Sequence, residues 1–128
     1  MILDTSAVVA VLLKEPGWDT ILQKLASEEQ AGIGIPTLAE TAIVLSARMR
    51  KDARPILSRF LSEAAIVPIP FAEEHYSAAI TCWLRFGKGR HRAALNFGDC
   101  LTYAVAKTAD EPLLFTGDDF SKTDVKKA

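Results

Sequence analysis

Four carboxylates stand at comparable places along the 128-residue chain. Asp4 directly follows the apolar pair Ile2-Leu3, and another acid follows the apolar segment near the end of the chain. The remaining two lie at the start of a predicted helix or within its first turn. The four residues are Asp4, Glu40, Asp99 and Asp118. Because the carboxyl ends of strands in an open α/β sheet meet at one edge, we expect these acids to converge there, Asp99 joining if its helix starts at that edge.

Each of these acids also has an ordinary structural explanation. Asp4, Asp99 and Asp118 could each cap a helix, and Glu40 could close a capping box with Thr37. Taken singly, the cap is the stronger interpretation. If the acids converge, however, two carboxylates about 4 Å apart repel by roughly 4 kcal/mol at an effective dielectric near 20. Such a cluster requires a cation or shared protons.

The ligand type indicates which cation and which chemistry. Oxygen ligands without histidine or cysteine suit Mg²⁺ or Mn²⁺, which retain several waters and bind through a few carboxylates together with a phosphate. A metal of this kind activates water and neutralises charge in phosphodiester hydrolysis. Glu40 or Asp118, acting through a water, could take the proton. Cys82 and Cys100 are isolated and are expected to be buried thiols rather than zinc ligands.

Short apolar segments alternate with longer helical ones along the whole sequence. This alternation predicts βαβ units and an α/β fold with a parallel sheet covered by helices on both faces. Pro68 cannot donate to a sheet ladder, so its strand is expected at a sheet edge. Strands are expected over 2–3, 31–35, 66–69 and 112–115, and helices over 7–15, 18–26 and 37–49, from 55, from 71 or 72, and over 99–109.

Composition limits the class of protein. With 128 residues, 49% of them hydrophobic, the chain is expected to form a single domain over 1–128. Its longest apolar run, 7–13, is far shorter than the roughly 20 residues of a membrane span, so we expect a soluble, cytoplasmic protein without a membrane partner. Fifteen basic and sixteen acidic residues give a net charge of −1, so any site for a polyanion must be local.

A basic loop precedes Asp99. Lys88, Arg90 and Arg92 could contact phosphates while neighbouring glycines let the backbone approach, although a solvated, mobile linker is an equally good interpretation. The aromatic residues Trp18, Trp83 and Phe86 keep helical spacing with apolar neighbours, which favours core packing over base stacking.

The ordered set of motifs resembles PIN-domain proteins, and within them the VapC-type toxins of bacterial toxin–antitoxin pairs. The motifs are Asp4-Thr5-Ser6-Ala7, Glu40, Asn96-Phe97-Gly98-Asp99 and the segment from Leu114 to Phe120. This resemblance implies a three-layer α/β/α fold with a short parallel central sheet. It also implies a magnesium- or manganese-dependent endoribonuclease acting on structured RNA such as tRNA or rRNA, usually a homodimer, held inactive by a small VapB-type antitoxin.

Carried over residue by residue, the resemblance makes Asp4, Glu40, Asp99 and Asp118 the catalytic and metal-binding acids. It places a hydroxyl from Thr5, Ser6 or Thr116 beside them. The doublet Asp118-Asp119 leaves the fourth acid open; Asp118 is favoured because it lies two residues after Thr116, as in the family pattern, and Asp119 is then a neighbour of the site.

Two other functions remain open at this point. Asp4 could be a phosphorylated nucleophile, but phosphatases of that kind carry a second aspartate two residues later, where this chain has Ser6. Alternatively, the chain could be a catalytically weak α/β interaction module, because the helix after Ser6 is apolar on nearly every face. Metal-dependent RNA cleavage distinguishes an enzyme from such a module.

Overall fold

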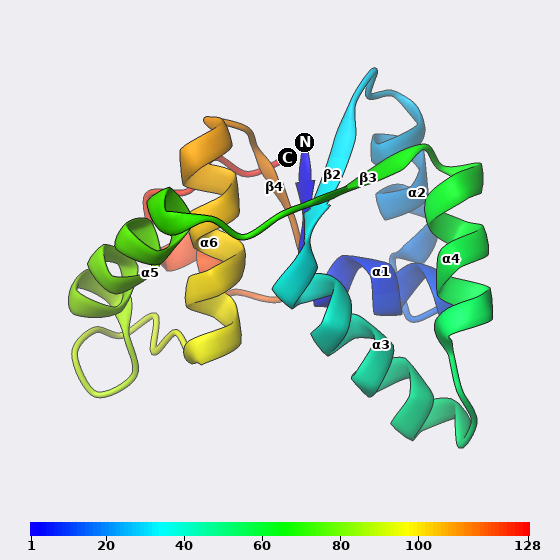
Figure 1. Ribbon diagram of the computed structural model, residues 1–128, viewed down its shortest axis with the longest axis horizontal. Helices are drawn as coiled ribbons and strands as arrows, with labels where there is room; N and C mark the ends of the chain where they lie inside the picture. Colours follow the sequence, from blue (N-terminus) through cyan, green and yellow to red (C-terminus); the bar gives the residue numbers. More distant parts are fainter.

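A four-stranded parallel sheet forms the centre of the protein, whose computed structural model describes residues 1–128 (Figure 1). The strand order is β3-β2-β1-β4, and all three pairings are parallel, as predicted. The edge strand β3 contains Pro68, as expected for a residue without an N–H group. The strands are β1 (Ile2–Leu3), β2 (Ala31–Gly34), β3 (Ile66–Ile69) and β4 (Leu113–Leu114).

Helices cover the sheet on both sides, so the predicted three-layer α/β/α arrangement is confirmed. In Figure 1, α5 and α6 lie to the left of the sheet, whereas α1, α2 and α4 lie to the right and α3 runs downward from β2. None of the helices combines the length and apolarity that a membrane crossing requires. The helices are α1 (Thr5–Leu12), α2 (Trp18–Ala26), α3 (Ile35–Met49), α4 (Arg54–Glu63), α5 (Glu73–Phe86), α6 (Phe97–Ala109) and the short 3₁₀ helix η1 (Phe120–Lys122).

The core consists of two apolar clusters that β1 separates. Successive side chains of a strand point to opposite faces of the sheet. Accordingly, Leu3 packs into the cluster formed with α1 to α4, and Ile2 packs into the cluster formed with α5 and α6. Cys82 and Cys100 are buried free thiols, as predicted, and burial raises the pKa of the Cys82 thiol. Burial on both faces explains why β1 is apolar at both positions.

Three helices begin two residues earlier than predicted, for reasons that lie in their caps. Asp4 caps α1 by accepting from the Ser6 N–H, and Asn96 caps α6. Helix α3 starts after Gly34 with Pro36 in its first turn, where the missing N–H costs nothing. The capping box considered for Glu40 therefore does not form. Thr37 is buried instead, with its hydroxyl 2.8 Å from that of Thr102.

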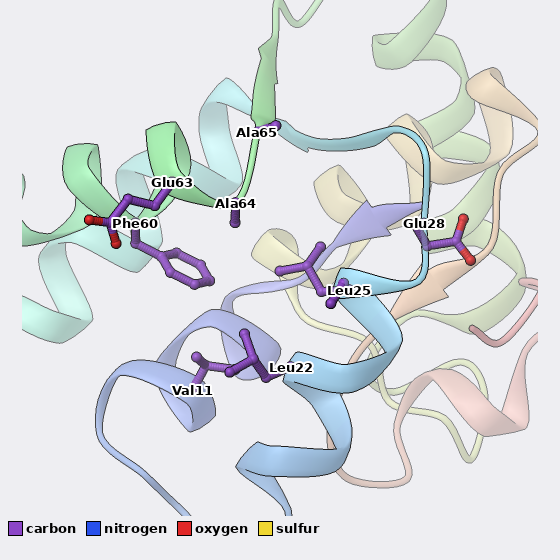
Figure 2. A pocket seen from close by; sticks show the side chains of 9 residues that line it. Val11, Leu22, Leu25, Glu28, Phe60, Glu63, Ala64 and Ala65 are labelled. Atoms are coloured by element: carbon purple, nitrogen blue, oxygen red, sulfur yellow. The ribbon is translucent and has the colours of Figure 1, made fainter.

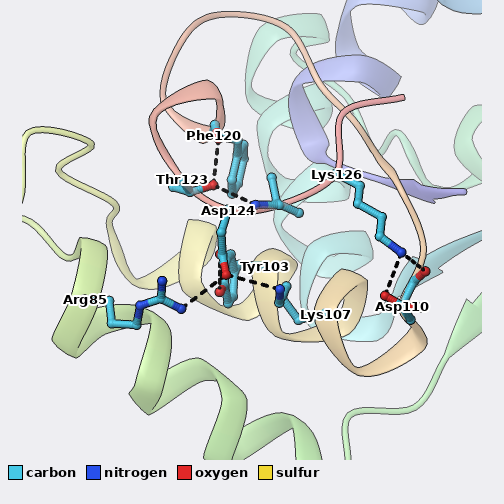
Figure 3. A network of polar contacts seen from close by, with 9 residues as sticks. Arg85, Tyr103, Lys107, Asp110, Phe120, Thr123, Asp124 and Lys126 are labelled. Carbon is cyan, nitrogen blue, oxygen red and sulfur yellow. Dashed lines mark hydrogen bonds and ion pairs between the residues drawn. The ribbon is translucent and has the colours of Figure 1, made fainter.

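The C-terminal segment is tied to β4 and α6. The N–H of Leu113 donates to the carbonyl of Lys126 at 2.8 Å, and a single parallel bridge joins Leu113 to Lys127. Figure 3 shows Asp124 accepting from Tyr103 at 2.7 Å and lying beside two cations of α5 and α6. Burial raises the pKa of Asp124, but the hydrogen bonds from Tyr103 and Lys107 outweigh it and lower that pKa below its ordinary value. This anchoring fixes the path of the chain after β4.

Candidate active site

An acidic pocket of about 260 Å³ opens where β1 and β4 end. Helices α1, α3 and α6 and the segment after β4 all contribute to it, so residues from both ends of the sequence share its wall. The lining residues are Asp4, Thr5, Ser6, Val9, Glu40, Val44, Asp99, Thr116, Asp119 and Phe120. The structure therefore shows acids converging at the carboxyl edge of the sheet, as expected.

The structure brings Asp4, Glu40 and Asp99 into this pocket, but the fourth lining acid is Asp119. Asp118, which the sequence pattern favoured, is exposed and does not line the pocket. The reason lies in the next residue: Phe120 is 3% exposed and packs on Phe115 with 5.3 Å between ring centroids. Burial of Phe120 fixes the turn before it and presents Asp119, not Asp118, to the pocket.

Asp4 serves as a helix cap and a pocket residue at once. Its Oδ2 accepts from the N–H of Ser6 at 3.0 Å and from the hydroxyl of Ser6 at 2.6 Å. The same hydroxyl accepts from the N–H of Thr116 at 3.0 Å. Ser6 thereby joins the segment after β4 to the start of α1. One carboxylate oxygen of Asp4, Oδ1, stays free of these bonds, so the cap does not exclude binding of a ligand.

Thr5 connects α1 to the helix that carries Glu40. Its hydroxyl accepts from the hydroxyl of Thr41 at 3.0 Å and donates to the carbonyl of Thr37 at 3.4 Å. These three threonines are buried, where a broken hydrogen bond between hydroxyls is costly. They hold the first two turns of α3, and with them Glu40, at a fixed place relative to Asp4.

Asp99 is the third residue of α6 and forms a capping box with Asn96. Its N–H donates to Asn96 Oδ1 at 2.9 Å, and its Oδ2 accepts from the Asn96 N–H at 3.0 Å. Burial raises the pKa of Asp99 to about 6; the hydrogen bond from Asn96 opposes this change, and the charges of the other three pocket acids add to it. None of the six ion pairs in the molecule involves a pocket acid. The pocket therefore carries uncompensated negative charge.

This raised pKa predicts how stability changes with pH. A folded pKa of about 6, above the ordinary 3.8, means that the native state holds the Asp99 proton more tightly than the unfolded chain. The resulting stabilisation is complete below about pH 4 and is lost as the pH rises through 6; two pKa units correspond to roughly 3 kcal/mol, and the loss is smaller than this because solvent screens the partly exposed carboxyl. Urea unfolding between pH 4.5 and 7.5 in chelator should show this decline, and Asp99→Asn should flatten it. Equal slopes in both proteins would contradict the assignment.

The basic residues of the loop between α5 and α6 lie outside the pocket. Lys88, Arg90 and Arg92 are all exposed. Backbone hydrogen bonds close the loop, since Lys88 N–H donates to Leu95 at 2.9 Å, and the Arg90 guanidinium lies 4.9 Å from the Trp83 ring centroid. The core prediction is wrong for Trp83, which is 43% exposed. It is confirmed for the buried Phe86, next to the loop.

The pocket also has apolar walls that the sequence did not single out. Val9, Val44 and Phe120 supply them. Val9 follows Thr5 by one helical turn, and Val44 follows Glu40 by the same spacing, so helical periodicity from the predicted site residues would have found both.

A second hollow, of about 500 Å³, lies between α1, α2 and α4 (Figure 2). Most of its side chains are apolar, and Glu28 and Glu63 are the charged residues among them. It contains no titratable cluster and belongs to a different part of the surface from the acidic pocket. Its remaining lining residues are Val11, Leu22, Leu25, Ala26, Phe60, Ala64 and Ala65.

The donor set in the acidic pocket fits a hydrated divalent cation rather than a tightly enclosed ion. No group of three or more His, Cys, Asp or Glu side chains is close enough to hold a metal ion directly. Mg²⁺ keeps several of its waters and usually binds through one or two carboxylates plus a phosphate, so separated carboxylates suit it. The absence of nitrogen and sulfur donors in the pocket argues against zinc.

The fold and the pocket define a class of α/β/α proteins with an acidic site at the carboxyl edge of a short parallel sheet. The family model of the PIN domain matches residues 1–126, and the chain belongs to that family.

Curated relatives and solved structures agree with this assignment. Ribonuclease VapC36 of Mycobacterium tuberculosis is 47% identical over 127 residues, 98% of this chain and 91% of the relative. Ribonuclease VapC of Mycolicibacterium smegmatis is 38% identical over 125 residues, 98% and 97% of the two chains. The crystal structure of Mycobacterium tuberculosis VapC20, described as a Sarcin-Ricin loop cleaving toxin, has a TM-score of 0.79 at 17% identity and covers 99% of this chain and 97% of that one.

A further solved structure, VapBC2 from Rickettsia felis bound to a DNA fragment from their promoter, has a TM-score of 0.77 at 18% identity. It covers 99% of this chain and 96% of that chain. At these low identities the two solved structures support the fold, whereas the curated relatives support the family.

Proposed function

We propose that this protein is the endoribonuclease toxin of a toxin–antitoxin pair and hydrolyses phosphodiester bonds in structured RNA. The observation that carries the proposal is the gathering of four acids, without a cationic partner, in one pocket of a PIN domain. The high identity to proteins named as VapC ribonucleases supports the same activity. The acids are Asp4, Glu40, Asp99 and Asp119.

We propose that a bound Mg²⁺ or Mn²⁺ supplies the charge neutralisation and the activated water that phosphodiester hydrolysis needs. Asp4 and Asp99 are suited to hold the cation, because in each a hydrogen bond occupies Oδ2 and leaves Oδ1 free. Glu40 and Asp119 are more exposed, so either can accept a proton through a water. The hydroxyl of Ser6 keeps Asp4 oriented in this process.

The substrate needs local positive charge, because an acidic pocket repels RNA. We propose that Lys88, Arg90 and Arg92 contact phosphates on either side of the cleaved bond. All three are exposed, and their loop leads into α6, whose first turn carries Asp99. Arg90 already packs on Trp83, so Lys88 and Arg92 are the freer of the three.

The deciding experiment is cleavage of total RNA by the purified, antitoxin-free protein. We expect discrete fragments with Mg²⁺ or Mn²⁺ and none with chelator, and end mapping of those fragments will name both the RNA and the bond. Failure to cleave any RNA with either metal would overturn the proposal. The remaining interpretation would then be a catalytically weak module that acts by binding a partner. If incubation with acetyl phosphate instead raised the protein's mass by one phosphoryl group, the result would favour the alternative in which Asp4 is a phosphorylated nucleophile.

We propose a small VapB-type antitoxin as the inhibitor, with the apolar hollow between α1, α2 and α4 as its docking site (Figure 2). Leu22 in this hollow is 36% exposed and continues its mostly apolar lining, and contiguous apolar patches of this kind mark protein–protein contacts. Glu28 and Glu63 favour an apolar segment that also carries basic residues. Copurification of a coexpressed antitoxin with the wild type, and its loss on Leu22→Asp, tests this site.

We also propose a homodimer. Four exposed apolar side chains surround a hollow of about 410 Å³ between α5 and the start of α6, and such a patch is unusual on a monomer. Light scattering that gives 13.9 kDa at micromolar concentration, instead of twice that mass, would exclude the dimer. The four residues are Tyr76, Ile80, Trp83 and Phe97.

A further inference from the structure

Gly98 occupies the first turn of α6, directly against the side chain of Glu40. A Cβ atom built at Gly98 would overlap Oε2 of Glu40 and approach its Cδ to 3.2 Å. The next nearest atom is Asn96 Oδ1, at an ordinary 3.5 Å. The space beside Gly98 is therefore taken by the end of one flexible side chain, and that side chain carries one of the pocket acids.

Neither the backbone nor the helix requires glycine at this position. Left-handed φ values occur at Gly17, Gly89 and Gly117, whereas Gly98 lies in regular helix. Glycine inside a helix is less favourable than alanine by roughly 0.5–1 kcal/mol. Local stability thus favours a larger residue at position 98, and the contact with Glu40 opposes one.

The other crowded glycines meet different neighbours. A Cβ at Gly32 would strike Ile69, and one at Gly34 would strike Val105, so both allow close packing of the core. At Gly87 the obstacles are the backbone and ring of Trp83. Gly98 differs from these three because its neighbour is a carboxylate that lines the acidic pocket.

We propose that Gly98 is a positioning residue for catalysis: the missing side chain lets the Glu40 carboxylate lie against the first turn of α6, beside Asp99. This inference rests on the proposed ribonuclease function. A side chain at position 98 leaves the fold intact, because the end of Glu40 can swing away, but it moves one acid relative to the other three. Misplacement of a catalytic group by about 1 Å can reduce a rate on the order of 100-fold.

The test compares Gly98→Ala with a matched change in the same helix, Thr108→Ala, which is exposed and remote from the pocket. Both variants should unfold at or above the wild-type temperature, since both raise helix propensity. Thr108→Ala should keep full activity. Gly98→Ala should lose about 10- to 100-fold in kcat/KM and need more Mg²⁺ for half-maximal cleavage.

Shortening the acid tests the contact itself. Glu40→Asp withdraws the carboxylate from Gly98, so adding Gly98→Ala to that variant should cost at least about 5-fold less activity than it costs in the wild type. Equal losses in the two backgrounds, or wild-type activity of Gly98→Ala, would overturn the inference. So would a lowered melting temperature that accounts for the lost activity.

A stability cycle tests the inference without catalysis. In the Glu40→Ala background nothing opposes a Cβ at position 98, so Gly98→Ala should raise the melting temperature by about 3 °C more than it does in the wild type. An equal shift in both backgrounds would show that Glu40 does not occupy this space. If the wild type cleaves no RNA while the cycle shows the expected difference, the ribonuclease proposal fails and the contact between Gly98 and Glu40 stands.

Discussion

Asp99→Asn is expected to reduce metal-dependent RNA cleavage by at least about 1,000-fold while making the protein more stable at pH 7.5. The amide keeps the shape of the carboxylate, and its oxygen can still accept from the Asn96 N–H. It removes a charge that burial and three neighbouring acids already disfavour, as the raised pKa of Asp99 shows. Initial cleavage rates at saturating Mg²⁺ and thermal unfolding of the same sample measure both effects.

The combination of lost activity and gained stability is what identifies a metal-binding acid here. Asp110→Asn is the matched control, since Asp110 lies at the other end of α6 and pairs with Lys126 on the surface (Figure 3). This control should keep its activity, with a change in stability within about 0.5 kcal/mol. Asp4→Asn should also lose metal-dependent cleavage, because it removes a charge from the same pocket. Full activity in both pocket variants would disprove the metal-binding role of these acids.

The adjacent acids after β4 give the second large effect. Asp119→Asn should lower cleavage about 100-fold, whereas Asp118→Asn should stay within about 3-fold of the wild type. The two substitutions are identical in chemistry and differ by one position, so each serves as the control for the other. Asp119 lines the acidic pocket and adds to the raised pKa of Asp99, but Asp118 does neither.

The reverse pattern would contradict this assignment. Loss of activity in Asp118→Asn with full activity in Asp119→Asn would mean that the turn at Gly117 rearranges when metal or RNA binds. Phe120 provides a test of the structural reason, because its burial fixes that turn. Phe120→Leu, which keeps an apolar residue there, should therefore leave the preference for Asp119 over Asp118 unchanged.

Much of the architecture could be predicted from local pattern. Alternating short apolar and longer amphipathic segments were enough to predict a parallel sheet between helical layers, and Pro68 was enough to place β3 at an edge. The positions of Asp4 and Glu40 relative to strand ends predicted their convergence. These features follow from periodicity and from missing hydrogen-bond donors, which are properties of a few neighbouring residues.

The remaining features depended on contacts between segments far apart in the chain. Thr37 fits a helix cap locally but lies inside α3, with its hydroxyl against Thr102. Trp83 has the helical spacing of a core residue but stays exposed. The loop after α5 places the Arg90 guanidinium over its ring, and no further helix covers it. In both cases a partner distant in sequence decided the outcome.

The pocket acids show which features the sequence determines and which depend on tertiary contacts. Residue type and order along the chain determined that this protein has a set of carboxylates at strand ends and the motifs of a PIN domain. Tertiary structure decided which member of Asp118-Asp119 lines the pocket, through burial of Phe120, and where the Glu40 carboxylate lies, through the empty side of Gly98. Asp118 and Asp119 lie in a turn and not in a regular helix or strand, so no periodicity of the sequence predicts which of them faces the pocket, and packing has to set the final position.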